Sequence, residues 1–236
     1  MKAIIVAGGR GERLRPLTDK LAKPMLEVAG KPILEHIVGF LKKNNITEII
    51  FSLCYKPETV ISYFGDGIKF GIKISYLIQK KIPQGTAGDI LKAQKYIKDT
   101  FIVTYGDILR ELDIAQLIKT HKKNKAFATL VVYKNKNQRP KSLVRFDRRG
   151  RVFKFLERPS MKEIKQADVW SNGSLYILEP AIFDFIPRGQ KSDFAYDIFP
   201  KILTAGKKVY AFEQTGYFID IGSKEKLEEA RRTFKT

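Results

Sequence analysis

Apolar positions along this chain follow two spacings, one typical of buried strands and one typical of amphipathic helices. Short runs rich in branched aliphatic residues predict strands, and apolar residues three or four positions apart predict helices that pack on a sheet. The expected strands cover residues 2–7, 47–53, 73–78, 101–105, 126–133, 143–146, 152–156, 176–179 and 209–213. The expected helices cover residues 32–41, 57–64, 90–97, 113–123, 180–186, 193–203 and 224–232. Their alternation predicts an α/β fold, with a mixed, mainly parallel, Rossmann-like sheet and helices on both faces.

We expect a single domain over residues 1–236, because the sequence contains no linker and no internal repeat. The sequence contains no hexapeptide repeat, so we expect no C-terminal β-helix. No apolar run is long enough to span a membrane, and no signal-peptide pattern precedes the first strand, so we expect a cytoplasmic protein. Cys54 is the only cysteine, which excludes an intrachain disulfide and favours a small core residue.

The first strand runs directly into a glycine-rich, basic loop. Gly8, Gly9 and Gly11 allow backbone conformations and close approaches that a Cβ would block, and five basic side chains lie between positions 10 and 23. A strand that feeds a loop rich in N–H groups and cations is suited to holding phosphate. The spacing matches neither a P-loop, which needs Gly-Lys-Ser/Thr, nor the dinucleotide fingerprint, whose third glycine position is Leu14.

Two aspartates follow apolar runs that lie far apart in the sequence. Asp107 comes shortly after residues 101–105, and Asp220 lies within residues 216–222, G-Y-F-I-D-I-G. Ligands of open α/β sheets lie at the carboxyl ends of the strands, so both side chains are expected at one edge if the strands are parallel. Two carboxylates beside a polyphosphate require a divalent cation between them, and Mg²⁺ fits oxygen ligands best. The alternative for Asp220 is a cap on the last helix.

Six motifs occur in a fixed order along the chain. They are G-G-x-G-x-R-L-x-P-L-T followed by K-P, then G-T-A-G, G-D, E-R-P, N-G-S-L-Y and G-Y-F-I-D-I-G. Together they resemble the sugar-phosphate nucleotidyltransferases, in particular the mannose-1-phosphate guanylyltransferase and glucose-1-phosphate thymidylyltransferase type. The resemblance implies the nucleotide-diphospho-sugar transferase fold. It also implies transfer of a nucleotidyl group from a nucleoside triphosphate to a sugar-1-phosphate, with Mg²⁺ as cofactor and pyrophosphate as the second product.

The resemblance implies a role for each matched side chain. Arg13 and Lys23 would act on the triphosphate, and Asp107 and Asp220 would hold Mg²⁺. The nucleotide would be bound by Ala7, Gly8, Gly9, Gly11, Gln79, Gly85, Thr86 and Gly88. The sugar phosphate would be bound by Glu157, Arg158 and Asn172. For Gln79, the alternative is a solvated side chain on a lysine-rich stretch.

The departures from the family pattern all lie on the sugar side. Arg158 replaces the usual lysine, and its rigid fork meets a phosphate with a different geometry. Ser142 stands where relatives usually have glycine, and residues 173–174 are Gly-Ser in place of Ala-Gly. Guanylyl transfer to mannose-1-phosphate or a related hexose or heptose phosphate is favoured, with thymidylyl or uridylyl transfer to glucose-1-phosphate as the alternative. The base, the sugar and a homo-oligomeric state stay open.

Charge and the two histidines change this picture little. Lys and Arg number 44 against 25 Asp and Glu, a formal net charge of +19, but they are spread along the whole chain. Without a nucleic-acid-binding motif we expect no specific nucleic-acid partner, although a nucleic-acid-binding protein stays as an alternative. A catalytically silent regulatory relative is the other alternative. His36 is expected to be structural, and His121 to be solvated on the lysine-rich face of its helix.

Overall fold

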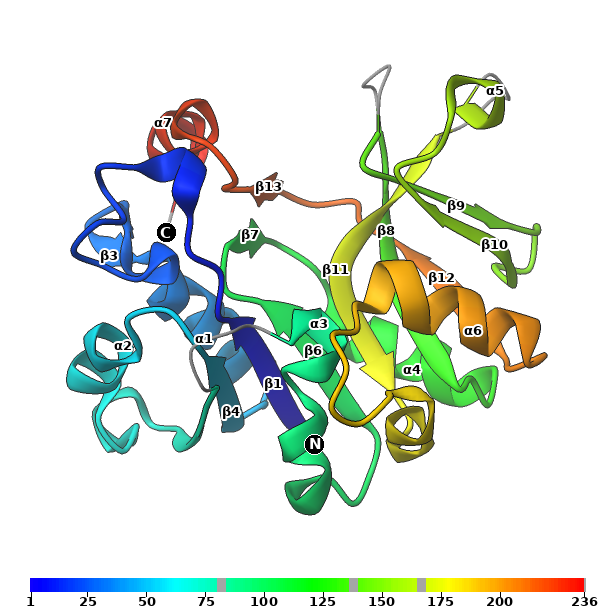
Figure 1. Ribbon diagram of the computed structural model, residues 1–236, viewed down its shortest axis with the longest axis horizontal. Coiled ribbons are helices and arrows are strands. Elements are labelled where there is room, and N and C mark those ends of the chain that lie inside the picture. Colours follow the sequence, from blue (N-terminus) through cyan, green and yellow to red (C-terminus); the bar gives the residue numbers. More distant parts are fainter. Residues whose placement is uncertain (80–83, 136–139, 165–168, 236) are drawn as a thin grey trace. The chain divides into compact units, whose positions relative to one another are not determined.

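The computed structural model describes residues 1–79, 84–135, 140–164 and 169–235 (Figure 1). The contacts between residues divide the chain into two compact units. The first unit comprises Met1–Pro83, Thr104–Leu112 and Gly216–Thr236, and the second comprises Gln84–Val103 and Asp113–Thr215. Strand β6 (Phe101–Tyr105) gives its first three residues to the second unit and its last two to the first.

The first unit is built on parallel strands with continuous apolar runs. Strand β1 (Lys2–Ala7) pairs in parallel with β4 (Glu48–Leu53), which pairs in parallel with β5 (Lys73–Ile78). The strand order on this side is β6-β1-β4-β5. Ile4, Ile5 and Phe51 are fully buried, as expected of a sheet that is covered on both faces.

Helices and short ribbons complete the first unit. Two antiparallel ribbons pair β2 (Glu27–Val28) with β3 (Lys31–Pro32), and β7 (Ile108–Arg110) with β13 (Phe218–Asp220). The α-helices are α1 (Ile33–Lys43), α2 (Pro57–Phe64) and α7 (Lys224–Thr233). The 3-10 helices are η1 (Glu12–Leu14), η2 (Lys23–Met25) and η3 (Ile68–Phe70).

In the second unit, antiparallel pairs join strands of the large sheet. Strands β9 (Ser142–Phe146) and β10 (Val152–Glu157) form an antiparallel hairpin. Strand β11 (Trp170–Leu178) is antiparallel to both β9 and β8 (Ala128–Lys134), and β12 (Val209–Glu213) is parallel to β8. The order on this side is β10-β9-β11-β6, with β8 beside β11 and β12. The mixed, mainly parallel α/β sheet predicted from the sequence is thus confirmed.

The helices of the second unit differ most from the prediction. They are α3 (Gly85–Gly88), η4 (Leu91–Tyr96), α4 (Ile114–Lys123), α5 (Met161–Ile164), η5 (Pro180–Phe185), η6 (Phe194–Ile198) and α6 (Phe199–Thr204). The helix expected over residues 90–97 is a 3-10 helix, and the one expected over 193–203 begins with a π-helical turn. Helix α4 agrees with the prediction, since the Asp113 side chain accepts a bond from Gln116 N at its start.

One side chain is placed wrongly by the sequence analysis. His121 is buried, not solvated, with 2% of its surface exposed. Its Nδ1 lies 2.8 Å from Thr129 Oγ1, and its Nε2 lies 3.0 Å from Glu179 Oε1. His36 is structural as predicted, because its Nε2 lies 2.7 Å from the Val28 carbonyl oxygen. Within the described part of the chain, no helix is long and apolar enough to cross a membrane.

Candidate active site

The loop after β1 is held in shape by one glycine in a left-handed conformation. Gly11 has φ of 65°, and a Cβ there would lie 2.8 Å from Thr18 Cγ2 and 3.1 Å from Lys23 Cβ. The Thr18 hydroxyl donates to the Gly11 carbonyl oxygen at 2.9 Å. By contrast, Gly9 is exposed, with nothing within 4 Å of a Cβ placed there. The loop therefore has a fixed base and an open tip at which its backbone can approach a ligand.

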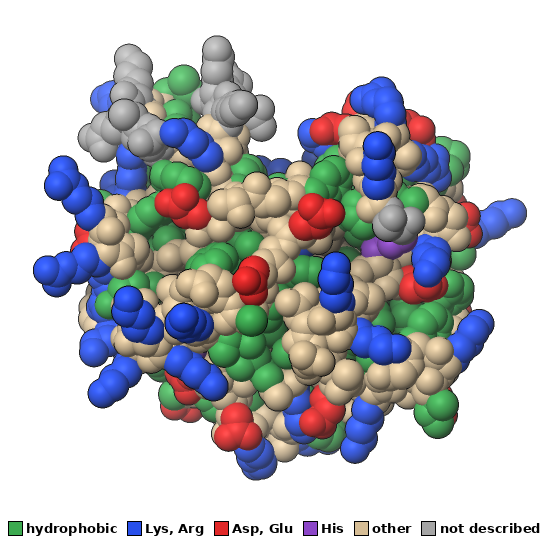
Figure 2. Space-filling model, turned by 180° about the vertical axis from the view of Figure 1, so that it is seen from behind, with side chains coloured by type: hydrophobic (Ala, Val, Ile, Leu, Met, Phe, Trp, Pro, Cys, Tyr) green, Lys and Arg blue, Asp and Glu red, His purple; other side chains and the backbone are tan. Residues whose placement is uncertain are grey.

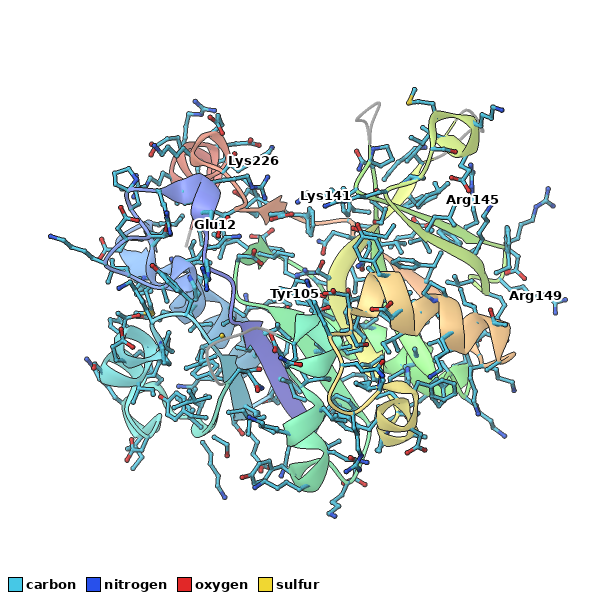
Figure 3. The ribbon with its side chains drawn as sticks, viewed as in Figure 1. Glu12, Tyr105, Lys141, Arg145, Arg149 and Lys226 are labelled. Carbon is cyan, nitrogen blue, oxygen red and sulfur yellow. The ribbon has the colours of Figure 1, made fainter. Side chains whose placement is uncertain are left out.

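The Lys-Pro and Gly-Asp dipeptides are packed against each other. Gly106 follows Tyr105, the last residue of β6, which is labelled in Figure 3. A Cβ on Gly106 would lie 2.9 Å from Ala7 Cβ and 3.4 Å from Pro24 Cβ, closer than a side chain tolerates. The Gly106 N–H donates to the Val6 carbonyl oxygen at 2.9 Å, which joins the segment to the end of β1.

This packing brings the next two side chains together. Lys23 Nζ forms an ion pair with Asp107 Oδ2. The two side chains are 13% and 26% exposed, so the pair is partly shielded from water. A shielded ion pair is stronger than one on an open surface. Lys23 and Asp107, which the sequence assigned to separate roles, are therefore direct partners.

The β7–β13 ribbon places the second aspartate, Asp220, beside the first, Asp107. Asp220 pairs in register with Ile108, the residue after Asp107, and Ile221 N donates to the Asp107 carbonyl oxygen at 2.9 Å. The sequence analysis expected the two aspartates at one edge if their strands were parallel, and this condition does not hold for Asp220, because β13 is antiparallel to β7. The helix-cap alternative for Asp220 is also wrong. The last helix is capped by Ser223, whose hydroxyl accepts from Lys226 N at 3.4 Å.

Arg13 completes this group of charged side chains. A Cβ on Gly222 would lie 2.9 Å from Arg13 Nη2 and 3.4 Å from Asp220 Oδ1, so the guanidinium and this carboxylate both lie beside Gly222. The first unit thus gathers four side chains that lie up to 207 positions apart in the sequence, Arg13, Lys23, Asp107 and Asp220. We call these four residues the phosphate cluster.

The phosphate cluster suits a hard divalent cation. Asp107 and Asp220 offer carboxylate oxygens, the ligands that Mg²⁺ prefers, and one of them already holds a cationic ammonium group. Among the described residues, no group of three or more His, Cys, Asp or Glu side chains could hold a metal. Two carboxylates fit the usual mode of Mg²⁺ binding, in which substrate phosphates and waters complete the coordination.

Gln79 lies in the same unit, directly after β5. Its N–H donates to the Leu53 carbonyl oxygen at 2.7 Å, and the residue is 5% exposed. The alternative that Gln79 is a solvated side chain is therefore wrong. Residues 82–83, which begin the predicted base-binding loop, lie outside the described residues.

In the second unit, the G-T-A-G segment is packed on residues 190–193. Ser192 N donates to the Gln84 carbonyl oxygen at 2.8 Å, and its own carbonyl accepts from Ala87 N and Gly88 N, both at 3.0 Å. Gly85 has φ of 80°, and a Cβ there would lie 2.4 Å from the Ser192 oxygen. Gly88 is similarly close, because its Cβ would lie 2.9 Å from Gln84 Cβ. These two glycines permit the close backbone contact.

The sugar-side residues occupy the ends of β9, β10 and β11. Glu157 pairs in register with Ser142. Arg158 N donates at 2.7 Å to the carbonyl oxygen of Lys141, the residue before β9, which is labelled in Figure 3. Burial raises the pKa of the Glu157 carboxyl to about 7, while the positive charges of Arg158 and Lys141 oppose the rise. Arg158 itself is exposed and has φ of 49°.

Asn172 is held by the serine that departs from the family pattern. The Ser142 hydroxyl accepts from Asn172 N at 2.8 Å. Asn172 Nδ2 donates to the Tyr176 hydroxyl at 2.8 Å, and its Oδ1 accepts from Ser174 N at 3.0 Å. Pairing of β11 with β8 is interrupted between Asn172 and Tyr176. Asn172 is the last residue paired before this bulge, opposite Val132.

The sequence analysis missed two residues that shape these sites. Asp193, which it placed only at a helix start, accepts bonds from Thr86, and Tyr176 accepts from Asn172. The signal for Asp193 is the pair of aspartates at positions 193 and 197. In the structure the Asp193 N–H donates to Asp197 Oδ2 at 2.7 Å, so the second aspartate bonds back to the start of the helical turn. Nothing local indicates the partner 107 positions away.

Comparison with known proteins agrees with this geometry. The family model described as nucleotidyl transferase matches residues 2–236. A D-glycero-alpha-D-manno-heptose 1-phosphate guanylyltransferase of Aneurinibacillus thermoaerophilus is 35% identical, over 98% of this chain and 97% of that protein. A UTP–glucose-1-phosphate uridylyltransferase of Synechocystis is 33% identical over 94% of this chain. The chain spans 60% of the length of that cyanobacterial relative.

A solved structure shares both the fold and part of the sequence. HddC from Yersinia pseudotuberculosis, complexed with GMP-PN, matches with a TM-score of 0.80 and 29% identity. The match covers 99% of each chain. Similarity over the full length means that both units, and not only the glycine-rich loop, have counterparts in that protein.

Proposed function

The chain belongs to the nucleotidyl transferase family, and on that premise we propose that it joins a nucleoside triphosphate and a sugar-1-phosphate, giving a nucleotide sugar and pyrophosphate. The observation that carries this proposal is the phosphate cluster. Two cationic side chains and two carboxylates converge beside an open glycine loop, as required for a highly anionic substrate that is held with a divalent cation.

The reaction needs positioning and charge neutralisation more than a side-chain base. The phosphate oxygen of the sugar-1-phosphate is already anionic, and it attacks the α-phosphorus in line while pyrophosphate leaves. Arg13 and the backbone N–H groups of residues 8–11 would hold the β- and γ-phosphates. Lys23 would contact the α-phosphate and stabilise the charge that develops there. Asp107 and Asp220 would hold Mg²⁺, whose chemistry when bound is to neutralise and orient phosphate oxygens.

The remaining contacts would come from the other residues that match the family motifs. Gly85, Thr86 and Gly88 would line the nucleobase, with Gln79 as a further base ligand. Glu157 and Asn172 would orient the sugar, and Arg158 would hold its phosphate. Arg158 is exposed, so its guanidinium is accessible to an incoming anion.

Guanylyl transfer to a heptose or hexose phosphate is the favoured pair of substrates. The relative from Aneurinibacillus, which this chain matches over nearly its whole length, supports it. Uridylyl transfer to glucose-1-phosphate is the second candidate, motivated by the Synechocystis relative. We further propose that residues 1–236 act as one domain. Because both substrates are multiply charged and do not cross a bilayer, we place the reaction in the cytoplasm.

The test is pyrophosphate release across a matrix of GTP, UTP, dTTP and ATP against mannose-, heptose- and glucose-1-phosphate. We expect turnover with GTP and a manno-configured sugar phosphate to exceed the other pairs. Turnover only with UTP or dTTP and glucose-1-phosphate would replace the favoured substrates by the second candidate. No release with any pair would leave the catalytically silent alternative.

The proposed cation has its own test. Asp107→Asn and Asp220→Asn keep the size of each side chain and remove an anionic ligand, so we expect folded proteins with activity reduced at low magnesium. Higher magnesium, or manganese, should restore part of it. Circular dichroism checks the fold and nucleotide-sugar formation the activity. Near-normal turnover of either variant at low magnesium would remove that aspartate from the proposed metal site.

A further inference from the structure

The Asp193 carboxylate reaches out of its own helix to the G-T-A-G segment. Asp193 Oδ1 accepts from Thr86 N at 3.0 Å and from Thr86 Oγ1 at 3.1 Å. The Thr86 hydroxyl in turn accepts from Phe194 N at 3.0 Å. Three bonds therefore interlock the segment Gly85–Gly88 with the first residues of the π-helical turn η6.

A helix cap does not explain this arrangement. The carboxylate of an aspartate before a helix usually accepts from an N–H two or three positions further on. Asp193 makes no such bond within η6, and the hydroxyl of Thr86 takes the Phe194 N–H instead. The Asp193 carboxylate thus bonds to the G-T-A-G segment, and the Thr86 hydroxyl of that segment bonds to the helical turn. These reciprocal bonds link two segments that lie 107 positions apart.

The negative charge of Asp193 also contributes to the raised pKa of two other carboxyl groups. Burial is the main cause of the raised pKa of Glu157, and the negative charge of Asp193 raises it further. Burial likewise raises the pKa of Asp89, again with a contribution from Asp193. The Asp89 carboxylate accepts from Gln84 N at 2.7 Å, just before the G-T-A-G segment. Strand β10, which ends at Glu157, packs against η6, so the carboxylate that holds the loop stands at the start of an element beside the sugar-side strand.

We propose that Asp193 is a positioning residue that couples the nucleotide-binding segment Gly85–Gly88 to the sugar-side carboxyl of Glu157. The inference rests on the proposed function, because that function assigns the two segments to the two substrates. The hydrogen bonds of Asp193 fix the loop, and its charge favours the protonated form of Glu157, in which the carboxyl can donate to a sugar hydroxyl. These two effects are separable by substitution.

Two variants separate them. Asp193→Asn keeps an oxygen that can accept both Thr86 bonds but removes the charge. Asp193→Ala removes the bonds and the charge together. Asp197→Asn is the matched control, because it removes a charge from the same helix start without touching Thr86. Thr86→Val removes the hydroxyl at nearly constant volume, and Thr86→Ser restores it.

The readouts are the dissociation constant of the triphosphate, from calorimetry, and the pH profile of the KM for the sugar-1-phosphate. We expect Asp193→Ala and Thr86→Val to weaken triphosphate binding about tenfold, the effect of one or two lost hydrogen bonds, and Thr86→Ser to bind normally. Asp193→Asn should bind the triphosphate normally but move the midpoint of the KM profile to lower pH. Asp197→Asn should leave both readouts unchanged.

Two results would separate failure of this inference from failure of the proposed function. If wild type releases pyrophosphate but Asp193→Asn leaves the pH midpoint unchanged and Asp193→Ala leaves triphosphate affinity unchanged, Asp193 is only structural. If wild type neither binds a triphosphate nor turns over, the proposed function fails and this inference fails with it. If Asp193→Ala does not fold, the Asp193→Asn midpoint alone decides.

Discussion

Lys23 holds Asp107 in an ion pair, and this pairing has a measurable consequence. An ammonium group and a divalent cation compete for the same carboxylate, so each must weaken binding of the other. We expect Lys23→Met to bind Mn²⁺ in the absence of nucleotide about tenfold more tightly than wild type, within the usual range of coupling between sites. Electron paramagnetic resonance titration of free Mn²⁺ measures this directly.

The same variant should lose turnover by about a hundredfold or more, the usual cost of removing one electrostatic donor to a transition state. Opposite effects on metal affinity and turnover are what a shared role for Lys23 requires. Lys20→Met is the control, because it removes an exposed charge from the same stretch of chain. An unchanged Mn²⁺ affinity in Lys23→Met would mean that the pairing does not limit access to Asp107.

Glu157 carries a second consequence at this scale, in the pH dependence of stability. Its pKa is raised by burial from 4.5 to about 7, so between these values the folded protein keeps a proton that the unfolded chain has lost. Its contribution to stability is therefore complete below about pH 4.5 and is lost as the pH rises towards 7. We expect the free energy of unfolding of wild type to fall across this window relative to Glu157→Gln. Urea titrations of both proteins at several pH values test the slope, and parallel curves would contradict the shift.

At the scale of the element, helix α4 shows where sequence patterns mislead. His121 follows Ile114 and Leu117 at the spacing of one helix face, and all three are buried. The lysines around it suggested a solvated position, but periodicity was the better guide. Regular strands and long helices were predictable because their apolar spacing repeats several times. The β7–β13 ribbon was not, since three residues are too few to show a period.

The same limit applies to the candidate sites. The sequence motifs located Arg13, Lys23, Asp107 and Asp220, because each lies in a run of recognisable residues. What they could not show is the contact between such runs. The Thr86–Asp193 bonds and the Lys23–Asp107 pair join segments 107 and 84 positions apart, and only the folded backbone decides which segments meet.

The buried histidine gives a prediction about the stability of the second unit. Glu179 Oε1 accepts from Thr100 Oγ1 at 2.7 Å as well as contacting His121, so α4, β8 and the end of β11 meet at one polar cluster. His121→Ala should lower the free energy of unfolding by about 2–4 kcal/mol, through a cavity and unpaired buried groups. Thermal or urea unfolding measures it. Lys122→Ala on the exposed face of α4 serves as control, with a change in the free energy of unfolding expected within about 0.5 kcal/mol.

At the scale of the whole molecule, the formal net charge of +19 is a property of the surface, where charged side chains are solvated. Figure 2 shows one face on which Lys and Arg side chains are dispersed, with carboxylates between them, and are not gathered in one stripe. Dispersed charge attracts anions without selecting a sequence. We therefore expect weak, non-specific binding of DNA or RNA, in the micromolar range or weaker, which disappears as salt increases. Fluorescence anisotropy with labelled oligonucleotides tests this, and a nanomolar, sequence-dependent complex at physiological salt would revive the nucleic-acid alternative.

The close packing of Gly106 against Ala7 and Pro24 also limits which substitutions these three positions can accept. A Cβ on Gly106 would lie 2.9 Å from Ala7 Cβ and 3.4 Å from Pro24 Cβ, so a larger residue there requires Ala7 above all to shift. Proline has no smaller equivalent that keeps its backbone angle, and alanine can shrink only to glycine. We therefore expect residues 7, 24 and 106 to be substituted together or not at all. In a library of single and double substitutions selected for activity, single changes at Gly106 should be depleted, and the surviving Gly106 variants should carry a second change at position 7.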